Sequence, residues 1–331
     1  MIEVAFDTSP LGQTRAGTAR YIRGLLSGLE RAPDVTVRRH GFALRGRAAV
    51  PARDLGWYLG VLPVLARGAD VLHCPTFRAP VRSRAPLVVT FHDLAVLRHP
   101  ELFNGWTRRY SRAFLPRVVR AAERVIAVSA FSARELVDLL GVPDEKIRVI
   151  SNAVGPPFTS AGEAAEGDYV LAVSTLEPRK NLGRLVEAFR RADLDGSELR
   201  IVGAPGWGEA GMVTSPGVRW LGEVSDDELA RLYRGARCAA YVSLYEGFGL
   251  PVLEAMACGT PVVAADLPPI QEFARGVVTV DPRDPDAIAA GLGEALARGD
   301  ELGRAGREAA AAYDWGRVAK ETIDVYRAVA R

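Results

Sequence analysis

Two hydrophobic patterns alternate along the chain. Short apolar runs such as Tyr169–Ser174 (YVLAVS) lack polar alternation, which is typical of parallel strands buried on both faces. Asn181–Arg191 instead carries Leu182, Leu185 and Phe189 on one stripe, the spacing of an amphipathic helix. Strands that alternate with helices predict βαβ units and a parallel sheet.

The same patterns predict further elements in both halves. Strands are expected at Ile2–Phe6, Val35–Gly41, Val71–Cys74, Leu87–Thr90, Val125–Val128, Ile147–Ile150, Leu199–Val202, Val218–Leu221, Cys238–Val242 and Pro261–Ala264. Helices are expected at Ala19–Arg31, Thr107–Ala122, Ala133–Leu140, Asp226–Arg234, Pro251–Cys258, Asp284–Arg298, after Glu301, and at Trp315–Ala330.

Residues 155–167 (GPPFTSAGEAAEG) are poor in apolar side chains and rich in Gly, Pro and Ser, so we expect a linker there. The chain is predicted to form two doubly wound, Rossmann-like α/β domains, residues 1–158 and 159–314, facing a central cleft. Sheets of this kind bind ligands beyond the carboxyl ends of their strands, so the loops after the strands are the places to search for chemistry.

Composition narrows the class of protein. The 331 residues are 48% apolar and 25% charged, which is ordinary globular usage. Three widely spaced cysteines form no CxxC or Cys/His cluster, which disfavours a disulfide framework or structural zinc site and fits a reducing cytoplasm. We expect no signal peptide at the N-terminus and no transmembrane segment.

Charge is divided unevenly. Residues 1–160 carry 23 Lys and Arg against 13 Asp and Glu, a net charge of +10, while residues 161–331 carry 19 against 27, a net charge of −8. A basic half suits an anionic partner such as nucleic acid, a phospholipid surface or a phosphorylated substrate, and charge complementarity between the halves explains it equally well. Among the 42 basic residues only three are lysines, at positions 146, 180 and 320.

Several common catalytic motifs are missing from the sequence. It contains no GxxxxGK[ST] phosphate loop, no GxGxxG after the first strand, no GxSxG and no HExxH. Two DxD triplets, at 193–195 and 284–286, do not follow buried strands, so we interpret them as helix caps rather than metal ligands.

The loop Ser174–Leu182 (STLEPRKNL) follows a predicted strand and contains two adjacent cations. Arg179 offers a planar fork for two phosphate oxygens, and Lys180 offers a point charge. Because lysine is rare in this chain, its use at position 180 suggests that the compact ammonium group of lysine is required there. A basic, solvated turn is the alternative.

A second segment, Ser243–Pro261, joins a strand to a helix that opens near Pro251. Gly247 and Gly249 permit close approach to the backbone, and the helix N-terminus is suited to an anion. Glu246 lies in the loop, whereas Glu254 has the simpler interpretation of serving the helix dipole. Two acids beside an anion site suit a ligand that carries both phosphates and hydroxyls, such as a nucleotide-sugar.

A third segment, Leu87–Leu94 (LVVTFHDL), places His92 and Asp93 after a buried strand. A position at the carboxyl end of a strand favours a functional role over a purely structural one for this histidine.

The segments match a known family. TLEPRKNL, SLYEGFGLPVLEAMACGTPVV and VDPRDPDAIAAGL resemble the donor domain of retaining glycosyltransferases of family 4, which have the GT-B fold. GTARY, FHDL and VIAVSAFSARELVDLLGVPDEKIRVI extend the resemblance into the first half. FHDL combined with TLEPRKNL is most similar to the mannosyltransferases that build O-antigens and related polysaccharides. The resemblance implies that residues 159–314 bind the donor, that 1–158 are acceptor-side, and that the helix of about 315–331 packs back on the first domain.

The resemblance also implies roles for individual residues. Arg179 and Lys180 would bind the donor diphosphate, Glu246 the hydroxyls of the transferred sugar, and Glu254 the ribose. His92 would approach the reacting sugar, with Asp93 on the acceptor side. The remaining donor-side positions are the amides of Gly247, Phe248, Gly249 and Leu250, Val224 beside the base, and Gly17 with Thr18 near phosphate or acceptor.

The implied reaction transfers a hexose with retention of configuration and needs no metal or other cofactor, because Arg179, Lys180 and the helix terminus stabilise the leaving diphosphate. The expected donor is GDP-mannose, with a UDP-sugar as the alternative, and the acceptor is a glycan, a lipid-linked glycan or a small molecule, not a nucleic acid. A sugar-nucleotide epimerase or hydrolase of the same fold, and a non-catalytic binding protein, are the competing functions. An epimerase should carry more acids and histidines, and a binding protein should have lost Glu246 or Lys180.

Residues 106–120 are rich in arginine and aromatic side chains, which suits peripheral contact with an anionic membrane at the cytoplasmic face. A solvated arginine face is the alternative.

Overall fold

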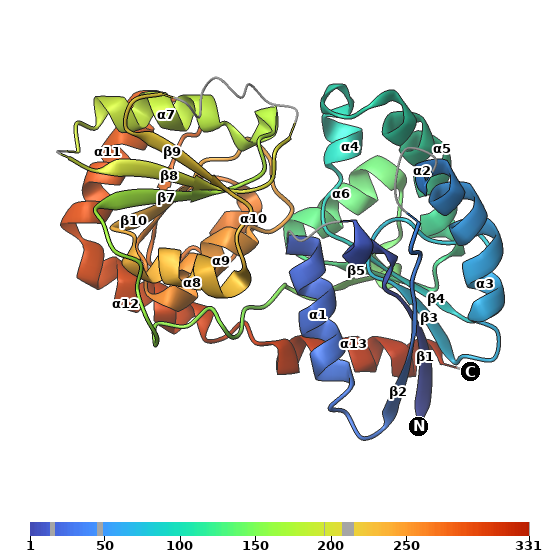
Figure 1. Ribbon diagram of the computed structural model, residues 1–331. Coiled ribbons are helices and arrows are strands. Elements are labelled where there is room, and N and C mark those ends of the chain that lie inside the picture. The colour runs from blue at the N-terminus through green and yellow to red at the C-terminus, as the bar shows by residue number, and fades with distance from the viewer. Residues whose placement is uncertain (14–16, 45–48, 195, 207–214, 331) are drawn as a thin grey trace. The chain divides into compact units, whose positions relative to one another are not determined.

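The chain folds into two compact units, each built on its own sheet. In the computed structural model (Figure 1), the N-terminal unit comprises residues 1–153 with 315–331, and the C-terminal unit comprises residues 154–314. The structure describes residues 1–13, 17–44, 49–194, 196–206 and 215–330. The chain therefore leaves the N-terminal unit once and returns to it with its last helix.

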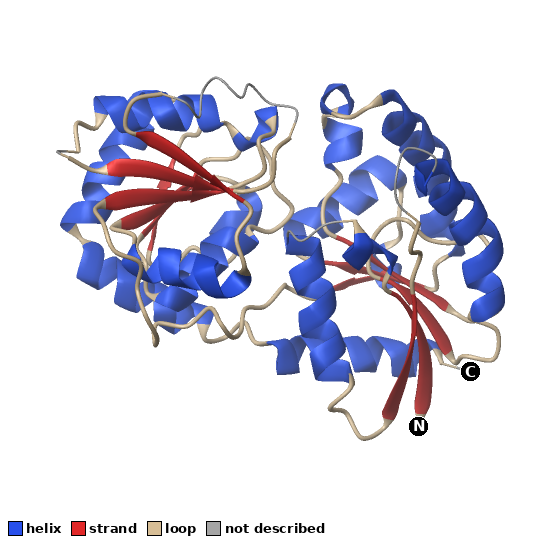
Figure 2. Cartoon of the chain, in the orientation of Figure 1, coloured by secondary structure: helices blue, strands red, loops and turns tan. Residues whose placement is uncertain are grey.

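Six parallel strands form the N-terminal sheet, in the order β2-β1-β3-β4-β5-β6 (Figure 2). Alternate residues of the first strand pack into the cores on opposite faces of the sheet. Val4 and Phe6 pack with α1 and α13, and Ala5 packs on the other face. Burial on both faces explains why these strands are continuous apolar runs. The strands are β1 (Ile2–Asp7), β2 (Val35–His40), β3 (Val71–Cys74), β4 (Leu87–Phe91), β5 (Arg124–Ala127) and β6 (Ile147–Val149).

Helices cover both faces of this sheet (Figure 2). They are α1 (Gly17–Leu29), α2 (Ala49–Pro51), a π-helical segment (Ala52–Val61), α3 (Leu62–Leu65), α4 (Ala95–Arg98), α5 (Gly105–Ala121), α6 (Ala130–Leu140) and α13 (Trp315–Val329).

Small residues allow α1 and α13 to pack closely. A Cβ at Gly24 would lie 2.1 Å from the Trp315 ring, and one at Gly28 would lie 2.5 Å from Cβ of Ala319. Only glycine fits at these two contacts, so the helix-spaced pair Gly24 and Gly28 fixes where α13 lies.

The C-terminal unit has a second six-stranded parallel sheet, in the order β12-β11-β10-β7-β8-β9. Its strands are β7 (Tyr169–Val173), β8 (Glu198–Val202), β9 (Val218–Gly222), β10 (Cys238–Tyr241), β11 (Val262–Ala265) and β12 (Val277–Val280). Its helices are α7 (Leu182–Arg191), α8 (Asp226–Gly235), α9 (Leu250–Cys258), α10 (Pro268–Gln271), α11 (Pro285–Ala297) and α12 (Gly299–Ala310).

The structure confirms the predicted fold class, but the sequence pattern missed several elements. The helices α4 and α10 are only four residues long, too short for helical periodicity to show, and the edge strand β12 alternates between buried and more exposed residues instead of being buried throughout. The helical stretch Ala49–Leu65 was also missed, because apolar residues occupy both its buried and its exposed positions. Of the DxD triplets, Asp284 accepts a hydrogen bond from the Asp286 amide as the cap of α11, as predicted. Asp195 lies outside the described residues.

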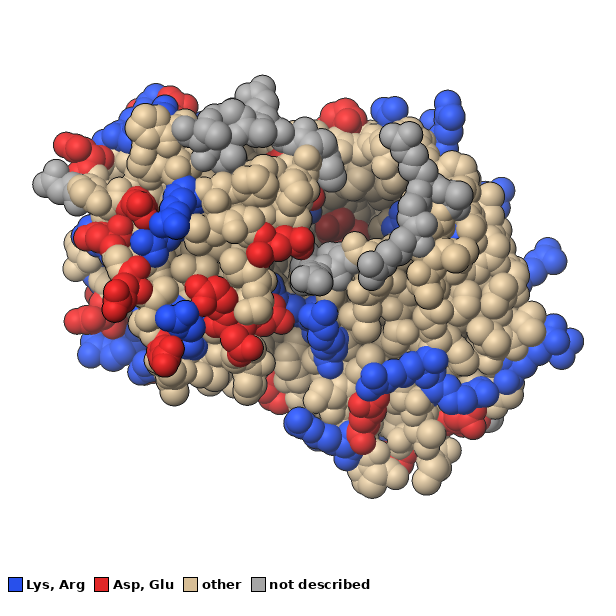
Figure 3. Space-filling view, viewed as in Figure 1, with Lys and Arg blue, Asp and Glu red and all other residues tan. Residues whose placement is uncertain are grey.

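Charged side chains are distributed over the surface as the sequence indicates. On the face seen in Figure 3, mainly Lys and Arg project from the N-terminal unit, whereas the C-terminal unit shows many Asp and Glu with Lys and Arg among them. All three cysteines are buried free thiols, and burial raises the pKa of Cys238 to about 12. Within the described ranges, no helix has both the length and the apolar character needed to cross a membrane.

Candidate active site

Two loops meet at the carboxyl edge of the C-terminal sheet. The loop after β7 ends in a short 3-10 turn, Pro178–Lys180, and the loop after β10 leads to α9. The Leu244 amide donates a 2.8 Å hydrogen bond to the Arg179 carbonyl, which ties the two loops together. The predicted residues Arg179, Lys180 and Glu246 are therefore brought to one place.

Lys180 and Glu246 form a buried ion pair. Nζ of Lys180 lies 2.6 Å from Oε1 of Glu246, and each side chain is only 9% exposed. The same Nζ donates to the Tyr241 hydroxyl at 2.8 Å and lies 5.0 Å from the centroid of the Tyr241 ring. Two of the three ammonium donors thus have partners within the protein.

Arg179 is held beside this pair. Its Nε donates to Glu177 at 3.1 Å, and one terminal nitrogen donates to the Tyr245 carbonyl at 3.2 Å and to Glu246 at 3.4 Å. These contacts orient the guanidinium group at the sheet edge, where its planar fork is suited to an oxyanion.

The cations keep Glu246 ionised. Burial alone would raise its pKa, but the charges of Lys180 and then Arg179 outweigh burial and lower the pKa of Glu246 to about 2. At neutral pH the carboxylate can therefore accept hydrogen bonds but cannot donate one.

Asn181 belongs to the TLEPRKNL motif, and the structure gives it a role. It adopts a left-handed backbone conformation, with φ of 60°, and its side-chain amide donates to the carbonyls of Val242 at 3.0 Å and Pro282 at 2.6 Å. A strained residue held from two sides fixes the turn that carries Arg179 and Lys180. The sequence signal was an asparagine directly before a helix, since asparagine tolerates this conformation better than most residues.

The start of α9 needs a glycine. Gly249 has φ of +113°, and a Cβ there would lie 2.4 Å from Cδ1 of Ile270. Phe248 points into the core, where its ring stacks on Phe273 with centroids 4.9 Å apart, and Leu250 is also buried. Because the side chains of Phe248 and Leu250 point into the core, a ligand at this turn would contact the backbone amides, as the family resemblance implies.

Two further predicted donor-side residues, Glu254 and Val224, lie on other elements of the C-terminal unit. Glu254 is 1% exposed within α9, and its Oε2 accepts a 3.3 Å hydrogen bond from the Tyr233 hydroxyl of α8. Val224 is half-buried in the loop between β9 and α8. Their predicted contacts with ribose and base remain predictions.

In the N-terminal unit, His92 follows β4 and is held by a backbone carbonyl. Its Nε2 donates to the Pro75 oxygen at 2.9 Å, and its ring packs edge-on against Tyr21, with centroids 4.8 Å apart. Burial lowers the pKa of His92, so the ring is neutral near pH 7. Since a carbonyl can only accept, the proton is on Nε2 and the lone pair is on Nδ1.

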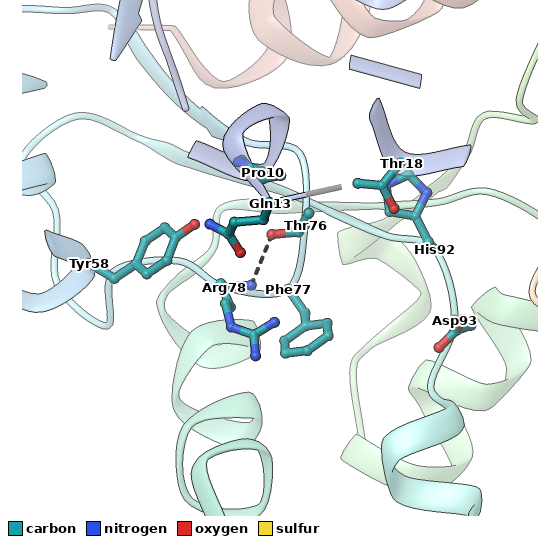
Figure 4. A pocket seen from close by; sticks show the side chains of 9 residues that line it. All are labelled: Pro10, Gln13, Thr18, Tyr58, Thr76, Phe77, Arg78, His92 and Asp93. Carbon is teal, nitrogen blue, oxygen red and sulfur yellow. Dashed lines mark hydrogen bonds between the residues drawn. The ribbon is translucent and has the colours of Figure 1, made fainter. Parts of the chain in front are cut away.

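His92 lines a pocket of about 340 Å³ that lies wholly in the N-terminal unit (Figure 4). Figure 4 shows Phe77 and Arg78 next to each other on one side, with His92 and Asp93 on the other. Asp93 also accepts from the Ala95 amide at 3.0 Å and so starts α4. The complete lining is Pro10, Gln13, Thr18, Tyr58, Thr76, Phe77, Arg78, His92 and Asp93.

Of the two residues predicted at the start of α1, Thr18 lines this pocket, and Gly17 is the first residue of the helix. Sequence reasoning missed Arg78 and its partner Asp54. Nε of Arg78 donates to the fully buried Asp54 at 3.1 Å, and nothing in the local sequence connects these two positions.

Comparison with known proteins identifies the class. The family described as glycosyl transferases group 1 matches residues 158–312, and glycosyltransferase family 4 matches residues 16–156. An O-antigen chain mannosyltransferase B from Escherichia coli is 31% identical, with 78% of this chain and 74% of the relative covered. A D-inositol 3-phosphate glycosyltransferase from Geodermatophilus obscurus is 33% identical, with 91% and 77% covered.

A solved structure of sucrose-phosphate synthase from Thermosynechococcus elongatus shares the fold, with a TM-score of 0.82, 19% identity and 99% of both chains covered. Two parallel sheets flanked by helices are the architecture of the GT-B fold. The chain belongs to glycosyltransferase family 4 and is a glycosyltransferase. The epimerase or hydrolase alternative is not favoured.

Proposed function

We propose that this enzyme transfers mannose from GDP-mannose to a glycan or lipid-linked acceptor, with retention of anomeric configuration and without a metal ion. The observation that carries the proposal is the buried Lys180–Glu246 pair beside Arg179, at the sheet edge where doubly wound folds bind ligands. A UDP-sugar is the alternative donor.

In this proposal the cations receive the donor diphosphate. Lys180 has three N–H donors and uses two of them on Glu246 and Tyr241, so the third can reach a phosphate oxygen. Arg179 and the amides at the start of α9 add further positive charge. Together they stabilise the charge that develops on the leaving diphosphate, which is the work that a metal ion does elsewhere.

Glu246 is assigned to the transferred sugar. Its carboxylate is ionised, and Lys180 and Arg179 hold it in place, so it can accept hydrogen bonds from sugar hydroxyls. The bond from the anomeric carbon to the diphosphate breaks while the acceptor oxygen bonds to that carbon from the same face. The acceptor proton passes to the departing phosphate oxygen, so no protein base is required.

We assign the pocket at His92 to the acceptor side. The lone pair on Nδ1 of His92 can accept a hydrogen bond from a sugar hydroxyl, and Asp93 and Thr18 supply further polar groups. The arginines of α5 are proposed to contact anionic lipid, which suits a lipid-linked acceptor at the cytoplasmic membrane face.

The proposal is tested by thermal-shift titration with GDP, UDP, ADP and their sugar conjugates, with and without EDTA. A ligand at 100 times its Kd should add about 2.7 kcal/mol to the free energy of unfolding. We expect selective stabilisation by GDP and GDP-mannose that EDTA leaves unchanged. Selectivity for UDP would change the donor, and no response to any nucleotide would refute the assignment of the donor site.

A further inference from the structure

The helical stretch Ala49–Leu65 has an unusual polarity. Its only charged residues, Arg53 and Asp54, are buried, while every exposed position from 50 to 65 carries an apolar residue or glycine. A surface helix normally shows the opposite arrangement. The exposed large side chains, which we call the apolar ridge, are Val50, Leu55, Leu59, Val61, Val64 and Leu65, each 37–49% exposed.

Buried hydrogen bonds hold the apolar ridge outward. Asp54 accepts from Nε of Arg53 at 2.7 Å, from Nε of Arg78 at 3.1 Å and from the Trp106 indole at 2.9 Å. One turn further on, the Tyr58 hydroxyl donates to Asp7 at 2.9 Å. Rotating the helix to bury the apolar ridge would break this network, so the exposure of the ridge is built into the fold.

The apolar ridge is concentrated as well as exposed. Of the described large apolar residues that are more than about a third exposed, six belong to the apolar ridge, and Trp106, which contacts Asp54, is a seventh. In the described part of the C-terminal unit, Trp220 alone reaches that exposure. Clustered exposed apolar groups of this kind mark interaction surfaces, whereas scattered ones need no explanation.

Positive charge lies beside the apolar ridge. Arg67 follows it directly, and α5 begins at its side because Trp106 bonds to Asp54. The sequence of α5 contains five arginines and no acidic residue, and Arg108 and Arg112 are among those exposed.

We propose that the apolar ridge inserts into the surface of an anionic lipid bilayer, with Arg67 and the α5 arginines binding lipid headgroups. An apolar face with tryptophan and arginine at its border is the composition of interfacial membrane helices. A second copy of this chain fits less well, because a two-fold contact through the apolar ridge would bring two sets of arginines together.

Docking in this way would connect the bilayer to the pocket. Asp54 holds both the helix that carries the apolar ridge and Arg78, which lines the pocket. A lipid-linked acceptor could then reach the pocket from the membrane surface. This last step and the lipid contact of the α5 arginines rest on the proposed function, whereas the insertion of the apolar ridge does not.

Vesicle flotation tests the inference. The full chain should float with vesicles of phosphatidylglycerol and phosphatidylcholine and much less with phosphatidylcholine alone. Leu59→Asp/Val64→Asp should lower partitioning more than about tenfold, because charges replace side chains that insert into the bilayer. Val137→Asp, at an exposed apolar position on α6, is the matched control and should float like the wild type. Arg108→Glu/Arg112→Glu should also weaken binding, whereas Arg304→Glu on α12 should not.

Wild-type protein that stays unbound, or a Leu59→Asp/Val64→Asp variant that floats normally, would overturn the inference. So would a dimer in analytical ultracentrifugation that this variant converts to monomers without vesicle binding. Thermal shift with GDP on the same variant keeps the two proposals separate, because the donor residues lie in the other unit and their response should be unchanged.

Discussion

At the scale of single residues, the Lys180–Glu246 pair is the most informative feature. A buried ion pair adds little net stability, because removing two charges from water offsets their attraction. Its presence at the carboxyl edge of a sheet, with Arg179 at 3.4 Å, is better explained by ligand binding than by folding.

We predict that Glu246→Gln lowers kcat for transfer by about 100-fold or more, since loss of one preorganised polar group at the reacting centre typically has such an effect. Nucleotide binding should be largely intact, because the variant keeps the shape of the side chain and both cations. Lys180→Ala should weaken binding and transfer together. Isothermal titration with GDP and a transfer assay measure the two effects.

Glu177→Gln is the matched control, because the Glu177 carboxylate accepts a 3.1 Å hydrogen bond from the Arg179 guanidinium, whereas its bond to Lys180 is between backbone groups and is kept in the variant. It should have a much smaller effect on kcat. Normal turnover by Glu246→Gln would refute the role that we give to this carboxylate.

At the scale of elements, close helix packing joins the two ends of the N-terminal unit. α1 and α13 are distant in sequence, and Gly24 and Gly28 create the space that Trp315 and Ala319 fill. The aromatic ring of Trp315 also packs edge-on against Tyr21, with centroids 6.1 Å apart.

We predict that Gly24→Ala lowers the free energy of unfolding by roughly 1–3 kcal/mol, the usual cost of overpacking. Its new Cβ would lie 2.1 Å from the Trp315 ring, so the helices must separate. Gly56→Ala is the control, because it has no neighbour within 4 Å and gains helix propensity. Urea unfolding of both variants is the measurement, and equal stabilities would contradict the packing argument.

At the scale of the whole molecule, each unit has its own sheet and core, and a buried polar network spans the N-terminal one. Nδ1 of His73 lies 2.6 Å from the Tyr326 hydroxyl of α13, and Nε2 lies 2.9 Å from Oγ1 of Thr90. Thr90 in turn shares a 3.0 Å hydrogen bond with Tyr21 of α1. The network therefore connects two strands and two helices around one histidine.

We predict that acid destabilises this unit through His73. Burial lowers the pKa of His73 from 6.5 to about 3, so the unfolded chain binds the proton more readily than the folded one. The stability is fully present above pH 6.5 and is lost as the pH falls toward 3. Between pH 7.5 and 5.5 the loss from this group should be about 1 kcal/mol.

Urea unfolding at the two pH values measures this loss. His73→Gln, compared with itself across the same range, should show a smaller pH dependence even though it is less stable overall. An unchanged pH dependence in this variant would assign the acid sensitivity to other groups.

The sequence by itself determined the parallel α/β architecture, most strand positions and the motifs that carry Arg179, Lys180 and Glu246. These are local properties, because each depends on whether a segment is apolar throughout, periodic or interrupted by a loop. The family resemblance supplied the roles of the site residues, which local pattern alone left open.

Only the tertiary structure decided which distant residues meet and which face of a helix is covered. Lys180 and Glu246 are 66 residues apart, and they pair because β7 and β10 are neighbours in the sheet. Likewise, Leu55, Leu59 and Leu65 are apolar enough for a core, and a buried network around Asp54 holds them at the surface. Hydrophobicity allows a side chain to be buried, but the contacts that the rest of the chain makes with its helix determine whether it is buried.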